Sequence, residues 1–441
     1  MKLHLVVCLL AAALALSPAA SLEHLAPGCA ETAEGPGSDI LDDGWLEERG
    51  GVPVLHVAGS QYDMGYQHGF LLRNETRENI RAMLHGRSVS RLYARWNTTK
   101  AYVPEGYIEE LQGLADGAGI PFSEVAAAYM SVVTWGMGCF GIAAWGNATR
   151  QGDMLHFRSF DLPMDIQDPV TGTYVHENAV LIVREPLHGY ASLSASIAGS
   201  LNGGGGFNEH GVAVGIHTSW THDATFKGTP AMLRIQMTLD HAGTAAEGVS
   251  YLTANGTAGW SFIVSDAHAK AGYAVETTAN HSYVGGHDSP VESTSPFWSI
   301  PQVVRRTNFF ISPEVAATQR SHYDPSGIPG FIRIFTDDEP FFVIWQSYRA
   351  MSQLIETHYG TLDFNTSMVL FQRGYRGDTD LGLQVLLRLT EGTSFNRAWN
   401  MWVADTASGD VDVAFATRLQ PAQYNEIHRF NFYELLAATP P

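Results

Sequence analysis

The chain has 441 residues, of which 45% are hydrophobic and 44 are glycine, so its composition predicts a well-buried, sheet-rich globule of one or two domains. Its 45 acidic residues exceed its 26 basic residues, which gives a formal net charge of −19. This acidity argues against nucleic acid as a partner, because binding to phosphates requires clustered lysine and arginine.

The first twenty residues have the pattern of a secretory signal peptide. A charged start is followed by an apolar run from Leu3 to Leu16 and then by small residues. We therefore expect a signal peptide over residues 1–20, a mature chain that begins near Ser21, and a secreted or lysosomal protein. No later run is long and apolar enough to cross a bilayer, so we expect no transmembrane anchor. Glycosylation on this route is predicted at the sequons of Asn74, Asn97, Asn147, Asn255, Asn280 and Asn365.

Three cysteines occur, and Cys8 lies in the predicted signal peptide, which leaves Cys29 and Cys139 in the mature chain. An exported protein of this size without a disulfide framework depends on its hydrophobic core. A single bridge between Cys29 and Cys139 is an open alternative. Such a bridge would exclude Cys139 as a nucleophile.

The segment before Cys139 predicts one strand followed by helices. The strand is expected over residues 52–57 and a helix from Gly59 to about Leu84, in which His68 is interpreted as a packed, structural histidine. A second helix is predicted over residues 104–118, where it meets glycines, and a third over residues 121–131.

The stretch from residue 138 to residue 163 predicts a β-hairpin. One strand leaves Cys139, a turn covers residues 147–153, and the returning strand covers residues 154–160.

This hairpin would bring three reactive side chains together. A hairpin folds its far end back to its start, so Arg158 and Asp161 would lie beside Cys139. Thiol, guanidinium and carboxylate together would form a polarised nucleophile with an orienting partner. The alternative interpretation is a buried apolar cysteine next to a surface ion pair.

After Cys139, short β-type runs alternate with glycine and asparagine turns up to about Val284. Residues 203–211 predict a flexible turn and no phosphate loop, since no Lys or Ser/Thr follows in the required order. Residues 234–252 predict one helix, and sheets with flanking helices favour stacked α-β-β-α layers. No metal site is predicted, because the spacing fits no compact ligand set at His210, His217, His222 and His241.

Seven short motifs follow one another along the chain, and their order can be compared with that of known families. They are residues 59–69, residues 111–119, Gly138-Cys139, His156-x-Arg158-x-x-Asp161-x-Pro163, residues 207–214, Thr307-Asn308-Phe309, and Ser347-x-Arg349. Together they resemble the isopenicillin N acyltransferase-like (acyl-coenzyme A:6-aminopenicillanic acid acyltransferase) family of cysteine N-terminal-nucleophile (Ntn) hydrolases. Phospholipase B-like proteins, acid ceramidase and bile-salt hydrolases are related to it. The chain departs from this pattern at Phe140, Ser159 and Phe309, where relatives often carry Thr or Ser, Asn, and His.

The resemblance implies an α+β fold, a four-layer α-β-β-α Ntn-hydrolase sandwich of antiparallel sheets. It also implies a helical pro-segment over residues 21–138 and a catalytic domain over residues 139–441. Cleavage between Gly138 and Cys139 would yield two fragments that stay associated.

The resemblance assigns a role to each site residue. Cleavage would leave Cys139 with its own α-amine, whose pKa near 8 suits a general base for a thiol of pKa near 8.5. Asp161 would hold this amine, Arg158 would favour the thiolate and contact substrate, and Asn308 would donate to the oxyanion. Arg349 would bind a substrate carboxylate or form a structural salt bridge. No cofactor is implied.

The expected activity is cleavage or transfer of the acyl group of an amide, with a small-molecule acyl amide or a lipid as substrate. A phospholipase-B-like lipid acyl hydrolase is the alternative within the same fold. A catalytically silent secreted binding protein is the alternative from another class.

Overall fold

The structure is a computed structural model that describes residues 38–41, 43–131, 138–319, 327–328, 331–332, 341–389 and 397–440. The predicted signal peptide and Cys29 lie outside these residues. Ser38–Pro441 forms one compact unit. Within the described ranges, no helix combines the length and the apolar character needed to cross a membrane.

The larger of two sheets is built from nine strands of the described chain. Their order is β1 (Trp45–Arg49), β2 (Val52–Gly59), β5 (Ala179–Pro186), β6 (Ser192–Ile197), β7 (Gly205–Asn208), β8 (Val212–Thr218), β9 (Trp260–Asp266), β10 (Ala271–Thr277) and β11 (Ser282–Gly285). Neighbours are antiparallel except β2 and β5, which run parallel. Parallel neighbours need a long connection, and here the connection contains the N-terminal helices and the predicted hairpin.

The smaller sheet is antiparallel throughout. Its order is β12 (Val303–Arg306), β3 (Gly138–Ala144), β4 (Leu155–Asp161), β13 (Ala398–Asp405), β14 (Asp410–Phe415) and β15 (His428–Asn431). Every residue of β3 and β4 is buried, because this sheet is covered on both faces.

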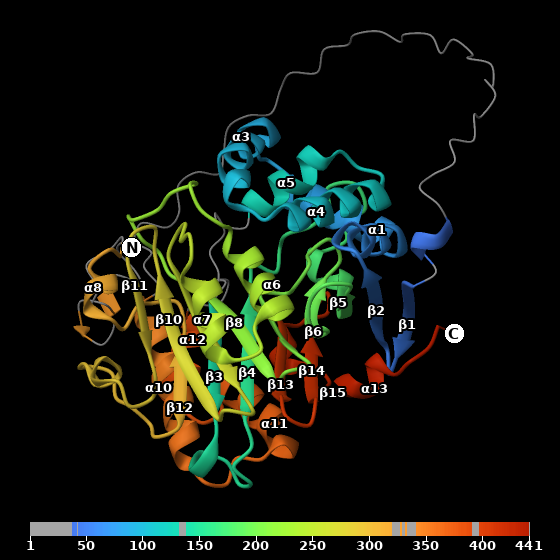
Figure 1. The fold of residues 1–441 in the computed structure, drawn as a ribbon. Helices are drawn as coiled ribbons and strands as arrows, with labels where there is room; N and C mark the ends of the chain where they lie inside the picture. Colours follow the sequence, from blue (N-terminus) through green and yellow to red (C-terminus); the bar gives the residue numbers. More distant parts are fainter. Residues whose placement is uncertain are drawn as a thin grey trace, which may run out of the picture. The chain divides into compact units, whose positions relative to one another are not determined.

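Helices form the outer layers (Figure 1). Those with described ends are α1 (Gln61–Leu71), α2 (Arg73–Leu84), α3 (Val89–Thr99), α4 (Glu105–Ala118), α5 (Phe122–Ser131), α6 (Ala231–His241), α7 (Ala245–Thr253), α8 (Pro313–Ala316), α10 (Phe341–Thr357), α11 (Phe364–Tyr375), α12 (Leu381–Leu389) and α13 (Phe432–Leu436). The inner faces of the sheets pack together, with β3 against β8 and β9 and with β12 against β10. Helices α6 and α7 cover the larger sheet, and α10 and α11 cover the smaller one. The predicted α+β fold with four α-β-β-α layers is confirmed.

The described residues that precede Cys139, from residue 38 to residue 131, are part of the same compact unit as those that follow it. Strands β1 and β2 belong to the larger sheet, and α1 packs closely against α4. A Cβ atom at Gly65 would lie 2.0 Å from the carbonyl oxygen of Glu110, and one at Gly113 would lie 2.2 Å from that of Tyr62. Glycine at these positions therefore lets the two helix backbones touch.

Several predicted elements are found, and three predictions were wrong. The strand at residues 52–57 lies in β2, and α4 ends at Gly119, whose φ of +65° is the left-handed conformation that glycine favours. The helix expected from Gly59 to Leu84 is two helices that meet at Leu72, and the one expected at residues 234–252 breaks before Thr244, which caps α7. The glycine-rich stretch 203–211 contains strand β7. A short break inside a continuous helical pattern is invisible to periodicity.

Candidate active site

The predicted hairpin is present as strands β3 and β4. Antiparallel pairing places Gly138 opposite Asp161 and Cys139 opposite Phe160. Arg158 lies three residues before Asp161 on the same strand. The register of the hairpin therefore sets Asp161 beside the predicted cleavage position.

The thiol of Cys139 is free, and the residue is only 3% exposed. Arg158 Nη2 donates to Cys139 Sγ at 3.4 Å, and the peptide N–H of Asp161 also donates to the sulfur. Burial raises the pKa of the Cys139 thiol and outweighs Arg158, which lowers it. The thiol is therefore held protonated near neutrality and needs a base before it can attack. A free thiol at Cys139 does not support the alternative of a disulfide bridge to Cys29.

The end of strand β12 holds the backbone of Cys139 on both sides. The peptide N–H of Cys139 donates to Asn308 Oδ1 at 2.7 Å, and Thr307 Oγ1 donates to the carbonyl oxygen of Cys139, also at 2.7 Å. Asn308 Nδ2 donates to the carbonyl oxygen of Thr218 at 2.9 Å. Asn308 thus lies at Cys139 as expected, in contact with the nitrogen that would become the α-amine. Thr307 was in the sequence motif but had no role assigned.

Asp161 is fully buried, and its carboxylate accepts a hydrogen bond from the hydroxyl of Tyr375. Burial raises the pKa of Asp161 to about 7, although Tyr375, Arg158, Ser159 and the peptide N–H of Arg397 each act to lower it. The carboxyl can therefore change its charge near neutral pH. Sequence reasoning missed Tyr375, which reaches the site from the end of α11.

Glycines make room for Arg158 between the two sheets. A Cβ atom at Gly215 would lie 2.7 Å from Arg158 Cδ, and Arg158 Nε donates to the carbonyl oxygen of Gly204 at 3.4 Å. The guanidinium lies 5.4 Å from the ring centre of Phe160. Its Nη1 has no hydrogen-bond partner among the described residues. The glycine-rich stretch that sequence analysis treated as a turn therefore borders the candidate site.

Arg349 is engaged elsewhere. Its Nη2 lies 3.0 Å from Asp380 Oδ2, and its Nε donates to Gln346 Oε1 at 3.0 Å. These contacts fit the structural salt bridge that was one of the two interpretations of this residue. No contact joins Arg349 to the Cys139 cluster within the described part of the chain.

The six predicted glycosylation sites share one property, which is that each asparagine is exposed. They are Asn74, Asn97, Asn147, Asn255, Asn280 and Asn365. Exposure makes all six accessible to a glycosyl transferase, and their modification stays a prediction.

The histidines that invited a metal interpretation are dispersed. His217 is buried behind Gly141, where a Cβ atom would lie 2.5 Å from His217 Nε2. His241 Nε2 lies 3.3 Å from the hydroxyl of Tyr107. Across the residues that the structure describes, no three His, Cys, Asp or Glu side chains group together as a metal site would require.

Relatives of this chain include an uncharacterized protein of Archaeoglobus fulgidus, which is 24% identical over 371 residues, or 73% of this chain and 58% of the relative. Protein dcd1A of Dictyostelium discoideum is 31% identical over 123 residues, or 27% of this chain and 26% of the relative. The chain thus spans little more than half the length of the first relative and about a quarter of the second.

A solved structure with a similar arrangement is penicillin V acylase from Agrobacterium tumefaciens, with 15% identity, a TM-score of 0.40, and coverage of 67% of this chain and 87% of that one. The family model "Acyl-coenzyme A:6-aminopenicillanic acid acyl-transferase" matches residues 151–327, a range that includes Arg158, Asp161 and Asn308 and leaves Cys139 outside. The resemblance to this family of Ntn hydrolases, first drawn from short motifs, is thereby confirmed for residues 151–327 of the chain.

Proposed function

We propose that this protein is an autoprocessing cysteine hydrolase that cleaves or transfers the acyl group of amides, with Cys139 as its nucleophile. The observation that carries the proposal is the convergence of Arg158, Asp161 and Asn308 on the thiol and backbone nitrogen of this one residue. The match to an acyltransferase family model over residues 151–327 supports the same class of chemistry.

The first step of the proposal is self-cleavage. Cys139 Sγ attacks the carbonyl carbon of Gly138, the peptide C–N bond breaks, and the nitrogen of Cys139 takes up the proton that the thiol loses. Water then hydrolyses the resulting thioester, which releases the carboxylate of Gly138 and restores the thiol. The nitrogen that now donates to Asn308 Oδ1 becomes a free α-amine in the same place.

Turnover of an amide would use that amine as general base. Burial raises the pKa of the Cys139 thiol, so the thiol needs a base to remove its proton, and the α-amine of the same residue is close enough to do so. Arg158 favours the thiolate by its charge, and Asp161 fixes the amine. Asn308 Nδ2 carries two hydrogens and donates one to Thr218, so the second can stabilise the oxyanion, a contact worth about 3 kcal/mol. Cys139 Sγ attacks the carbonyl carbon of the substrate amide after its proton passes to the α-amine, the amide C–N bond breaks, and the departing amine takes up that proton. The resulting acyl thioester passes its acyl group to water or to an acceptor amine, which restores the thiol.

The two fragments would stay together after cleavage. Strand β2 pairs with β5 across the cleavage position in sequence, and Arg184 Nη1 lies 2.5 Å from Glu110 Oε1. A shared sheet and a buried ion pair both oppose separation. Export through the secretory pathway, with a signal peptide and glycosylation at the exposed sequons, is part of the same proposal.

The test of self-cleavage is intact-mass analysis of the full chain, produced by secretion from a eukaryotic cell and deglycosylated. The proposal expects two fragments, the second with Cys139 as its first residue, and a single uncut chain for Cys139→Ala. A wild-type chain that stays uncut overturns the autoprocessing step.

The test of turnover is a panel of N-acyl amides, with lysophospholipids as the ester arm. Amide hydrolysis that disappears in Cys139→Ala supports the proposal. Activity that survives in Cys139→Ala contradicts it, and activity on the lysophospholipids alone would favour the phospholipase-B-like alternative. Fragments without turnover on any substrate would favour the silent binding protein.

A further inference from the structure

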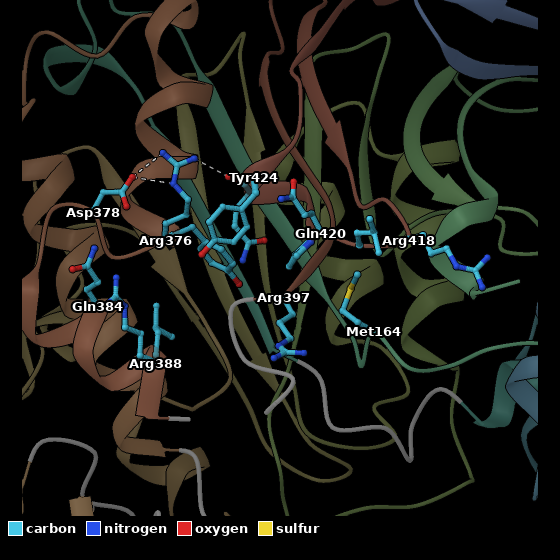
Figure 2. A pocket seen from close by; sticks show the side chains of 14 residues that line it. Met164, Arg376, Asp378, Gln384, Arg388, Arg397, Arg418, Gln420 and Tyr424 are labelled. Carbon is cyan, nitrogen blue, oxygen red and sulfur yellow. Dashed lines mark hydrogen bonds and ion pairs between the residues drawn. The ribbon is translucent and has the colours of Figure 1, made fainter. Parts of the chain in front are cut away.

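A polar cavity lies against the candidate site. It has a volume of about 600 Å³ and lies where α11, α12 and the start of β13 meet (Figure 2). Four arginines and one carboxylate line it, namely Arg376, Arg388, Arg397, Arg418 and Asp378.

Two of the lining residues also contact Asp161. The side chain of Tyr375 borders the cavity, and its hydroxyl donates to the carboxylate of Asp161. The peptide N–H of Arg397 donates to the same carboxyl, since the next residue along the chain pairs with Asp161 in the smaller sheet. Met164, three residues after Asp161, lines the cavity as well. The cavity is thus one side chain away from the proposed catalytic group.

Two of the arginines are already engaged. Arg376 forms two hydrogen bonds to Asp378 Oδ2, at 2.9 and 2.7 Å, as Figure 2 shows. Arg418 Nη1 lies 3.7 Å from Glu177 Oε2, which is not among the lining residues. Asp378 is the only carboxylate among the described lining residues, and it is already paired with Arg376.

The other two arginines hold positive charge that the described residues do not balance. The side chains of Arg388 and Arg397 form no ion pair with any described residue, and Arg388 is exposed. In a chain with a formal net charge of −19, a concave site with excess arginine is the opposite of the average surface. The guanidinium group matches carboxylate and phosphate oxygens with two parallel hydrogen bonds.

We propose that this arginine pocket, defined by Arg376, Arg388, Arg397 and Arg418, binds an anionic group of the substrate, a carboxylate or a phosphate. The inference rests on the proposed function, because it takes the ligand to be the acyl amide that Cys139 attacks. It names the substrate class as acyl amides that carry a negative charge. Neutral acyl amides would bind without this contact.

The experiment measures binding to the full-length Cys139→Ala chain, so that no turnover occurs, by isothermal titration calorimetry. The probes are four: N-lauroylglycine with a carboxylate, N-lauroyl-phosphoethanolamine with a phosphate, neutral N-lauroylethanolamine, and inorganic phosphate alone. The pocket is open in the uncleaved chain described here, so the uncleaved variant is the right protein. We expect at least one anionic amide to bind about tenfold or more tightly than the neutral amide.

The matched variants are Arg388→Gln with Arg397→Gln, compared with Arg150→Gln, an exposed arginine that pairs with Asp363 away from the cavity. The double variant should remove the tenfold preference for the anionic amide, and Arg150→Gln should keep it. Equal affinities for charged and neutral amides would overturn the inference, as would a preference that survives the double variant. Inorganic phosphate that binds as tightly as the amides would show a free-anion site and would also overturn it.

Failure of the proposed function and failure of the pocket assignment give different experimental results. If the anionic amides bind, the double variant abolishes the preference and the wild-type chain hydrolyses no amide, the pocket stands as a binding site for anionic amides, and the assignment of its ligand as a substrate falls with the proposed function. If wild-type protein hydrolyses neutral amides only and no charge preference is found, the proposed function stands and the pocket assignment falls.

Discussion

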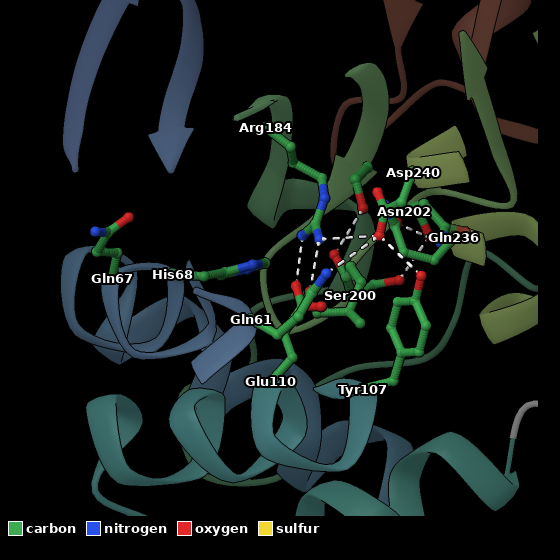
Figure 3. Close-up of polar contacts among 12 residues, drawn as sticks. Gln61, Gln67, His68, Tyr107, Glu110, Arg184, Ser200, Asn202, Gln236 and Asp240 are labelled. Atoms are coloured by element: carbon green, nitrogen blue, oxygen red, sulfur yellow. Dashed lines mark hydrogen bonds and ion pairs between the residues drawn. The ribbon is translucent and has the colours of Figure 1, made fainter. Parts of the chain in front are cut away.

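Two buried arginines, Arg184 and Arg158, have opposite surroundings. Arg184 on β5 lies 2.5 Å from Glu110 Oε1 and 4.0 Å from Asp240 Oδ2, in a polar network that also includes Gln61 and Tyr107 (Figure 3). Burial alone would lower the pKa of Arg184, but the two carboxylates outweigh it and raise that pKa. Its charge is therefore matched by neighbours at short range.

Arg158 has no such match. Its contacts to Cys139 Sγ and to the carbonyl oxygen of Gly204 are both 3.4 Å long, and the nearby carboxyl of Asp161 has a pKa of about 7. Incomplete pairing is not enough to mark a site, since Arg234 is also buried, and its hydrogen-bond acceptors among the described residues are one carbonyl and one hydroxyl oxygen. The difference lies in what converges on Arg158, which is a thiol and a carboxyl able to change charge. Arg184 thus has the contacts of a structural residue, and the function proposed above gives Arg158 a chemical role.

The largest effect is expected from Arg184→Met. Removing one partner leaves Glu110 and Asp240 buried without a counter-ion, which should lower the free energy of unfolding by about 3–5 kcal/mol. Urea unfolding followed by circular dichroism measures it. The double variant Arg184→Met with Glu110→Leu should recover part of the loss, because one of the two uncompensated carboxylates is gone and only Asp240 remains. A single-variant loss below 1 kcal/mol would end the contrast with Arg158.

The next effect concerns the pH dependence of stability at Asp161. Its pKa is about 7 when folded and 3.8 as a free side chain, so the contribution of its neutral form is fully present below pH 3.8 and is lost as pH rises through 7. Between pH 4.5 and pH 7 this loss amounts to about 3 kcal/mol at 1.36 kcal/mol per pKa unit. Asp161→Asn cannot ionise, so its unfolding free energy should fall less over this interval than that of the wild-type chain. Parallel pH profiles would contradict the assignment.

A smaller effect is expected at Arg158, on the activation free energy of catalysis and not on the free energy of unfolding. Arg158→Met should lower kcat/KM by about 100-fold, which is about 2.7 kcal/mol, because the thiolate loses its counter-charge. Its unfolding free energy should change by less than 1 kcal/mol, since the charge it removes was poorly paired. Arg234→Met is the matched control, and it should leave kcat/KM unchanged. A stability loss at Arg158 as large as that at Arg184 would erase the distinction between the two arginines.

The sequence allowed the hairpin and its three reactive residues to be predicted, because both strands are local and their separation fixes which residues meet. Asn308 was reachable only through the family resemblance, since it is 169 residues from Cys139 along the chain. The motif did not predict that Asn308 would contact the backbone nitrogen of Cys139 instead of an open oxyanion position.

Tyr375 and the Arg184 network were out of reach for a physical reason. Tyr375 is 214 residues from Asp161, and Arg184 is 74 residues from Glu110, so each pairing depends on how helices dock on sheets. Local pattern gives the helix but not the residue that faces a distant strand. The two helix breaks were missed for a related reason, since caps at Leu72 and Thr244 interrupt an otherwise helical pattern.

The smallest effect is expected at the ion pair of Arg349 and Asp380, which extends the comparison to the surface. Arg349 is 35% exposed, so water screens the pair, and the coupling energy in a double-mutant cycle of Arg349→Gln and Asp380→Asn should be about 0.2–1 kcal/mol. With no contact to Cys139 among the described residues, Arg349→Gln should change kcat/KM by less than about twofold. A tenfold rise in KM at constant kcat would instead restore the substrate-binding role that the family resemblance implied. That result would mean that the salt bridge opens when substrate binds, so that an arginine paired in the free protein can still take part in recognition.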